Sequence, residues 1–176
     1  MHDEGEAPLH HVFDLGGLSH AGVQLTVTAQ GDELARLAEW AGVEAVRAFA
    51  ANVALRRLTQ THFAFEADLT ADIVQICVVS LEPMETHIER HLARELHFTP
   101  RGRGERAELT LAAGDEDVPE EITSLHYDLA APLLEEFVLA IDPYPRKEGV
   151  AFELPQDPAA VPESPFAVLK SLKEGG

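Results

Sequence analysis

The sequence predicts an α+β fold: an antiparallel β-sheet of long strands with two covering helices and a Pro-rich C-terminal tail ending in a short helix. Apolar and polar residues alternate over most of residues 45–98, as expected for strands that bury one face. Two other segments, 32–41 and 129–141, repeat apolar residues at helical spacing instead. We expect a sheet of about four to six strands with both helices on one of its faces.

The N-terminal third holds short elements. Residues 12–15 form a possible first strand, and the alternation over residues 23–28 predicts a second. Asp32 is a suitable N-cap for the helix over 32–41, which Gly42 ends.

Three long antiparallel strands form the predicted centre of the sheet. Alternate residues from Phe49 to Leu55 share one strand face, and those from Phe63 to Ile73 share the next, with a turn at 59–61. The second of these strands is long enough that a bend or bulge is expected in it. Pro83 belongs to a second turn, because proline cannot join a central ladder, and 88–98 follows as the third strand.

The last predicted helix of the domain spans 129–141, with Asp128 as its cap and Pro132 in its first turn. Its predicted apolar face is Leu129, Leu133, Leu134, Phe137, Val138 and Ile141. We assign residues 1–146 to one α+β domain and 147–176 to a Pro-rich tether with a short amphipathic helix. That helix places Phe166, Leu169 and Leu172 on one side after Pro165. It can dock in cis on its own domain or in trans on a partner, and docking in cis is favoured.

The chain is strongly acidic, with a net charge of −18 over 176 residues. Such a surface repels phosphate and anionic lipid and attracts basic partners. Binding to DNA, nonspecific RNA coating and membrane binding are therefore not expected as the main function. The N-terminus has no signal-peptide pattern and no apolar run spans a membrane, so we expect a soluble, cytoplasmic protein.

Two metal-binding arrangements are conceivable. If the hairpin at 82–83 places Cys77 near Glu89, then His87 and His91 would share that face, and these are zinc-ligand types. A buried, inert thiol with surface histidines is the favoured alternative. The acidic run 115–117 could serve a metal-dependent hydrolase, but a solvated charge run is favoured. With no nucleophile motif or phosphate-binding glycine loop, we expect no cofactor and no enzyme activity.

Arginines suggest a possible RNA contact. Arg56 and Arg57 lie on a predicted strand, and Arg101, Arg103 and Arg106 lie in a predicted loop. Together they could grip a short RNA segment, whereas ion pairing with nearby carboxylates is the simpler alternative.

Three stretches, in order, resemble one family. Residues 74–83 (VQICVVSLEP) look like the central motif of the YceD-like family, the bacterial large ribosomal RNA subunit accumulation proteins. Residues 128–145 and 164–173 are similar to that family's acidic helix with its proline stop and to its terminal Pro-Phe-x-x-Leu-x-x-Leu-Lys segment. Many relatives carry a second cysteine in the central motif where this chain has Ser80, which puts any metal-dependent role in doubt here.

The resemblance implies a role in 23S ribosomal RNA accumulation and hence in large-subunit assembly. Our leading hypothesis is a non-enzymatic assembly factor that binds a large-subunit precursor, with a basic ribosomal protein as the direct contact. Direct RNA binding through the arginines is the alternative hypothesis, and a metal-dependent hydrolase is the third.

Overall fold

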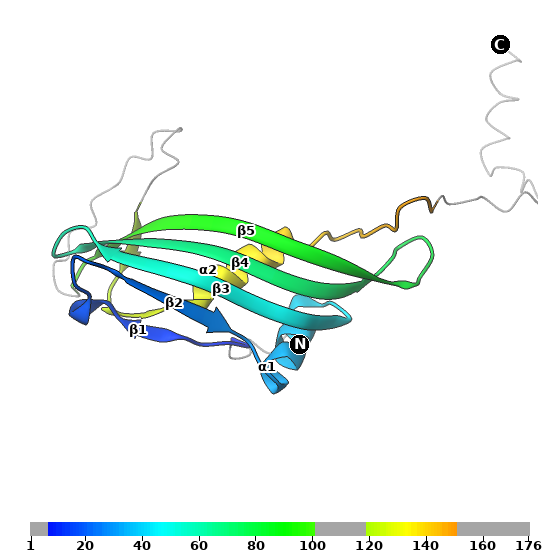
Figure 1. Ribbon diagram of the computed structural model, residues 1–176, viewed down its shortest axis with the longest axis horizontal. Coiled ribbons are helices and arrows are strands. Elements are labelled where there is room, and N and C mark those ends of the chain that lie inside the picture. Colours follow the sequence, from blue (N-terminus) through cyan, green and yellow to red (C-terminus); the bar gives the residue numbers. More distant parts are fainter. Residues whose placement is uncertain (1–6, 101–118, 151–176) are drawn as a thin grey trace, which may run out of the picture.

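The computed structural model describes residues 7–100 and 119–150 and confirms the α+β class. Figure 1 shows long, curved strands with the helices on one side of them. The elements are β1 (Val12–Asp14), the 3-10 turn η1 (Leu15–Gly17), β2 (Val23–Thr28), α1 (Asp32–Ala41), β3 (Ala45–Arg57), β4 (His62–Ile76), β5 (Pro83–Phe98), β6 (Glu120–Ile122), β7 (His126–Asp128) and α2 (Ala130–Ala140).

The main sheet has five strands in the order β2-β3-β4-β5-β6, and β1 pairs with β7 in a separate two-stranded sheet. Strands β2 to β5 are antiparallel, as predicted, but β6 runs parallel to β5, with Leu96 opposite Glu120. A parallel neighbour needs a long connection rather than a tight turn, and residues 99–119 supply that length. The expected wholly antiparallel sheet is therefore wrong at this edge.

One face of the sheet is buried under the helices. On β4, every second side chain from Phe63 to Ile73 is almost fully buried, and the residues that alternate with them point to the other face. Helix α1 contacts β3, whereas α2 contacts β4 and β5. The alternation in the sequence thus predicted the buried face correctly, because side chains of a strand point alternately to its two sides.

Several local predictions need correction. The N-cap of α1 is Gly31, and Asp32 is already in the helix; the Glu33 carboxylate accepts a hydrogen bond from the Gln30 N–H at 2.9 Å. In α2, Val138 is 41% exposed, so the buried face of that helix is narrower than its sequence suggested. The strand predicted to bend or bulge, β4, is curved (Figure 1), but the register shift lies between Val46 and Ala48 of β3.

The turn between β4 and β5 also differs from the prediction. Pro83 is the first residue of β5 and lies opposite Ile76, at a strand end where its missing N–H is tolerated. The turn itself is formed by Cys77 to Glu82, closed by a 2.9 Å hydrogen bond from the Cys77 N–H to the Glu82 carbonyl.

Candidate functional site: the open face of the sheet

The side of strands β2 to β5 opposite the helices forms an open face, which no element of the described residues covers (Figure 1). Along β3 this face carries small side chains, namely Ala48, Ala50, Asn52 and Ala54. They lie between Gln24 and Thr26 of β2 and the acidic side chains of β4. A shallow hollow runs there, and its lining includes Gln24, Thr26, Asn52, Glu66 and Asp68.

Carboxylates project from the open face on the two strands beside this hollow. Those on β4 are Glu66, Asp68 and Asp72, and those on β5 are Glu85, Glu89 and Glu95. Asp68, Glu85 and Glu89 are exposed by about three quarters of their side-chain surface. Because these carboxylates lie on adjacent strands about 5 Å apart, their fields add over one continuous surface.

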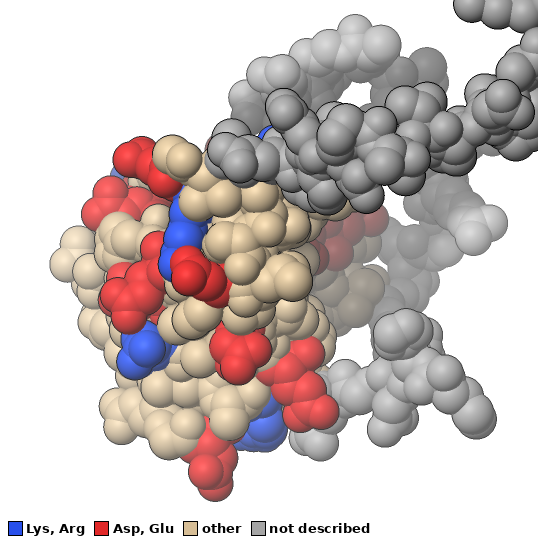
Figure 2. All heavy atoms as spheres, turned by 90° about the vertical axis from the view of Figure 1, so that its right-hand side faces the viewer, with Lys and Arg blue, Asp and Glu red and all other residues tan. Residues whose placement is uncertain are grey.

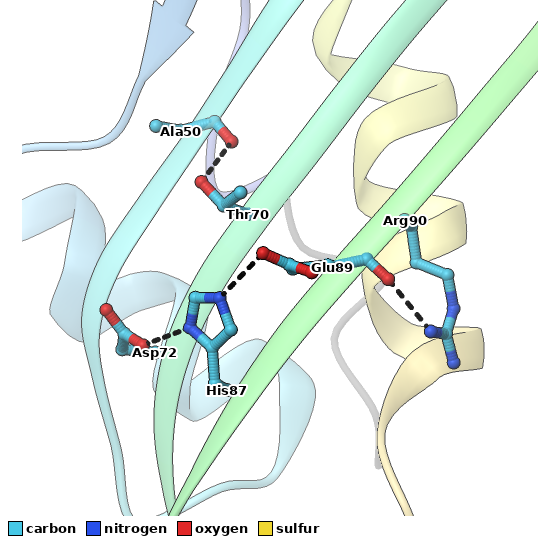
Figure 3. Close-up of polar contacts among 6 residues, drawn as sticks. All are labelled: Ala50, Thr70, Asp72, His87, Glu89 and Arg90. Carbon is cyan, nitrogen blue, oxygen red and sulfur yellow. Dashed lines mark hydrogen bonds and ion pairs between the residues drawn. The ribbon is translucent and has the colours of Figure 1, made fainter.

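Histidines on β5 sit beside these carboxylates. Figure 3 shows His87 between Asp72 and Glu89, with nitrogen–oxygen distances of 2.6 and 3.4 Å. The hydrogen bonds with the carboxylates of Asp72 and Glu89 raise the pKa of His87 above its ordinary value. His91 makes an equivalent contact with Asp68 at 2.8 Å. Protonation of His87 adds a positive charge beside these carboxylates, so the net charge of the face depends on pH.

The predicted arginine pair is split between the two sides of the sheet. Arg56 lies on the open face, where its guanidinium donates to the Glu66 carboxylate at 2.7 Å. Arg57 lies on the other side: it donates to the Leu18 carbonyl at 3.3 Å, and its guanidinium stands 5.5 Å from the centre of the Phe63 ring. Arg101 and Arg103 lie outside the described residues. Arg56 and Arg57 therefore do not form one patch.

The arginines of β5 also point away from the open face, toward α2. Arg94 donates to Glu135 of α2 at 2.5 Å and to Glu120 of β6 at 3.4 Å, and Arg90 pairs with Glu136 at 3.6 Å. Burial alone would lower the pKa of Arg94, but its contacts with Glu135 and Glu120 outweigh burial and raise it. These ion pairs hold α2 against β5. On the open face Arg56 pairs with Glu66, and Arg47 pairs with Glu85 at 3.3 Å. The remaining carboxylates keep that face acidic.

Cys77 lies in the β4–β5 turn, fully buried, and not beside Glu89 as the zinc arrangement required. Glu89 pairs with Thr70, which places it roughly 20 Å along the strands from the turn. The Cys77 sulfur accepts hydrogen bonds from Ser80 and from the Lys147 N–H, and these lower its pKa to about 6. Within the described ranges 7–100 and 119–150, no group of three or more His, Cys, Asp or Glu residues is arranged to hold a metal ion.

The family model for the large ribosomal RNA subunit accumulation protein YceD matches residues 65–173. The match covers more than half of the chain. This chain belongs to the YceD family. The match confirms the resemblance carried by the three motifs, and it includes all of the open-face carboxylates named above on β4 and β5. No curated protein and no solved structure matches the chain.

Membership of the YceD family assigns the chain to large-subunit ribosomal RNA accumulation, the role that the family's name states. Among the described residues, no helix is both long and apolar enough to cross a membrane. The predicted interaction residues Pro165, Phe166, Leu169 and Leu172 lie outside the described residues, so their role remains a prediction.

Sequence inspection singled out His87 and His91 but missed Asp68 and Asp72 as members of the same surface. The signal that would have found them is the alternation of buried and exposed residues, followed from β4 into the paired strand β5. Residues that alternate with the buried side chains of β4 pair with those that alternate with Ile88, Leu92 and Leu96 on β5. Applying the period of two to the polar positions of both strands at once would have revealed one acidic face.

Proposed function

We propose that this YceD-family chain is a non-enzymatic factor that supports 23S ribosomal RNA accumulation by binding a basic ribosomal protein of the large-subunit precursor on its open face. The observation that carries the proposal is the acidic open face itself, with its exposed carboxylates beside a hollow floored by small side chains. The family's named role supplies the ribosomal context.

The arrangement of side chains favours a basic polypeptide segment as the ligand. Ala50, Asn52 and Ala54 leave room for a backbone or a helix to approach β3. Asp68 and Asp72 border that space from β4, so lysine and arginine side chains of the partner would reach them. Ribosomal proteins carry such segments to neutralise RNA, and an acidic surface can shield them until RNA takes its place.

Direct RNA binding is the competing function. Phosphates would be repelled by the carboxylates of the open face, and Arg56 is already engaged by Glu66 at 2.7 Å. The RNA alternative therefore depends on Arg101 and Arg103, outside the described residues.

The test is affinity capture of the tagged full chain from its own cells, at low and moderate salt, with bound protein and RNA both identified. We compare the wild type with Asp68→Asn/Asp72→Asn. The matched control is Glu39→Gln/Glu148→Gln, which removes the same charge from exposed positions on α1 and after α2. We expect the open-face variant to lose a basic ribosomal protein at moderate salt and the control to retain it, because exposed charges act over about 10 Å.

Other outcomes would reject the proposal. Equal capture by the open-face variant and its control would show that position on the open face does not matter. Recovery of 23S precursor after complete removal of ribosomal proteins, abolished by neutralising Arg101 and Arg103, would favour the RNA alternative.

A further inference from the structure

An apolar groove lies at the end of the sheet where β4 meets the C-terminus of α2. We call it the end groove, and it is lined by Val43, Ile76, Val78, Val138, Ile141 and Pro143. Ile76, Val78 and Val138 are each about 40% exposed. Because they lie together, they form a contiguous apolar patch, and such patches commonly mark a binding surface. Figure 2 looks at this end of the molecule, where Asp and Glu side chains lie around uncharged surface.

The segment after α2 is fixed along one side of this groove. The Val78 N–H donates to the Pro145 carbonyl at 2.9 Å, and the Gln75 amide donates to the Asp142 carbonyl at 2.8 Å. Lys147 donates to the Glu82 carboxylate at 2.7 Å. The chain that leads to the C-terminus is thus held at the groove as far as Lys147, only three residues before the described part ends at Val150.

The groove also contains an unmatched hydrogen-bond acceptor. Gln75 is 6% exposed and lines the groove, and its side-chain oxygen has no partner among the described residues. A buried acceptor without a donor is unfavourable. Because this oxygen has almost no accessible surface, a donor would reach it only after the side chains at the groove rearrange.

We infer that the end groove is the docking site, in cis, for the chain's own segment 164–173. Its apolar side chains Phe166, Leu169 and Leu172 would cover the exposed groove residues. Its Lys170 and Lys173 match the charge of the lining, where Glu44 and Asp142 are the ionisable residues. This inference does not depend on the partner proposed for the open face.

The length of chain between the two parts suits docking in cis. Residues 151–164 include Pro155, Pro158 and Pro162, and in the extended polyproline conformation they would span roughly 40 Å. Because the tether begins beside the groove, it keeps the segment at an effective concentration of about a millimolar. A second copy of the chain would have to exceed that concentration to compete.

The experiment compares amide NMR spectra of the full chain in three forms. These are the wild type, Phe166→Ala/Leu169→Ala, and the control Phe152→Ala, which removes the same aromatic ring from the tether. We expect the double variant to weaken docking by more than tenfold and to shift the amides of Gly42, Ile76 and Val78. The control should leave those amides unchanged, and the amides of β4 away from the groove should not move in any form.

A substitution in the groove itself, with its own control, provides a second test. Val138→Asp should produce the same amide shifts as the tail variant, whereas Leu139→Asp, at a 79% exposed neighbour outside the groove lining, should not. Unchanged groove amides in the tail variant would overturn the inference. Groove shifts that vanish on roughly tenfold dilution of the wild type would overturn it too, in favour of docking onto a second copy.

Discussion

Phe137 anchors helix α2 to the helix-covered side of the sheet. Its side chain is fully buried, and its ring meets that of Phe49 on β3 edge-on, with centroids 5.4 Å apart and planes at 88°. Replacing Phe137 by alanine removes most of a buried aromatic side chain and leaves a cavity, a change that costs about 3–5 kcal/mol. The edge-on contact accounts for about 1 kcal/mol of that loss. Against a total stability of roughly 5–15 kcal/mol, the variant should be barely folded or strongly destabilised.

A nearby exposed residue of the same helix provides the control for this prediction. Leu139 is 79% exposed and lies outside the lining of the end groove, so Leu139→Ala should cost less than about 1 kcal/mol. Equilibrium urea unfolding, followed by the fluorescence of the single tryptophan Trp40 and by circular dichroism, measures both free energies of unfolding. If the two variants lost similar, small amounts of stability, α2 would not be anchored to that side of the sheet. The assignment of the opposite side as the open face would then fail as well.

Three further predictions concern protonation and backbone conformation. His87 should titrate above its ordinary pKa of 6.5, and Asp72→Asn should lower that pKa, as an NMR titration will show. Because the folded-state pKa is raised, the stabilisation from this pairing is complete below pH 6.5 and is lost as pH rises through the folded-state value. The Cys77 thiol should titrate with a pKa of about 6 instead of 9.0, as ultraviolet absorbance of the thiolate will show. Because the folded-state pKa is lowered, the stabilisation from the thiolate is complete above pH 9 and is lost as pH falls through about 6. Gly22→Ala should lower the free energy of unfolding by about 1–3 kcal/mol more than Gly42→Ala. Both glycines have positive φ, but only a Cβ at Gly22 would meet a main-chain oxygen, that of Leu55, at 2.7 Å. Equal losses in urea unfolding would contradict that steric argument.

The three central strands were predictable because the same physical signal runs through each of them. In β4, every second residue from Phe63 to Ile73 is buried, and that pattern alone fixes which side meets the helices. The direction of β6 was not predictable, because it depends on where a long connection returns the chain. The exposure of Val138 was not predictable either, because helical spacing shows which residues share a face but not how far the sheet extends beneath that face.

The candidate site was harder to predict than the fold. Arg56 and Arg57 looked like one basic patch because they are adjacent, yet neighbours on a strand point to opposite sides, and the structure separates them. Cys77 looked like a strand residue beside Glu89, but the turn begins at Cys77 itself, which moves the thiol away from the histidines. In both cases proximity in sequence was a poor guide and strand parity or register was decisive.

Strand parity also separates positive from negative side chains between the two sides of the sheet. On β5, Arg90 and Arg94 alternate with Glu89, His91 and Glu95, so a single strand directs its cations toward α2 and its anions toward the open face. A register slip of one residue would reverse this pattern and place arginines over the hollow beside β3. A high net charge favours solubility whatever the arrangement of the charges. The separation of charge by sides is what makes the open face a specific surface, and for that reason the control variant removes the same amount of charge at positions away from that face.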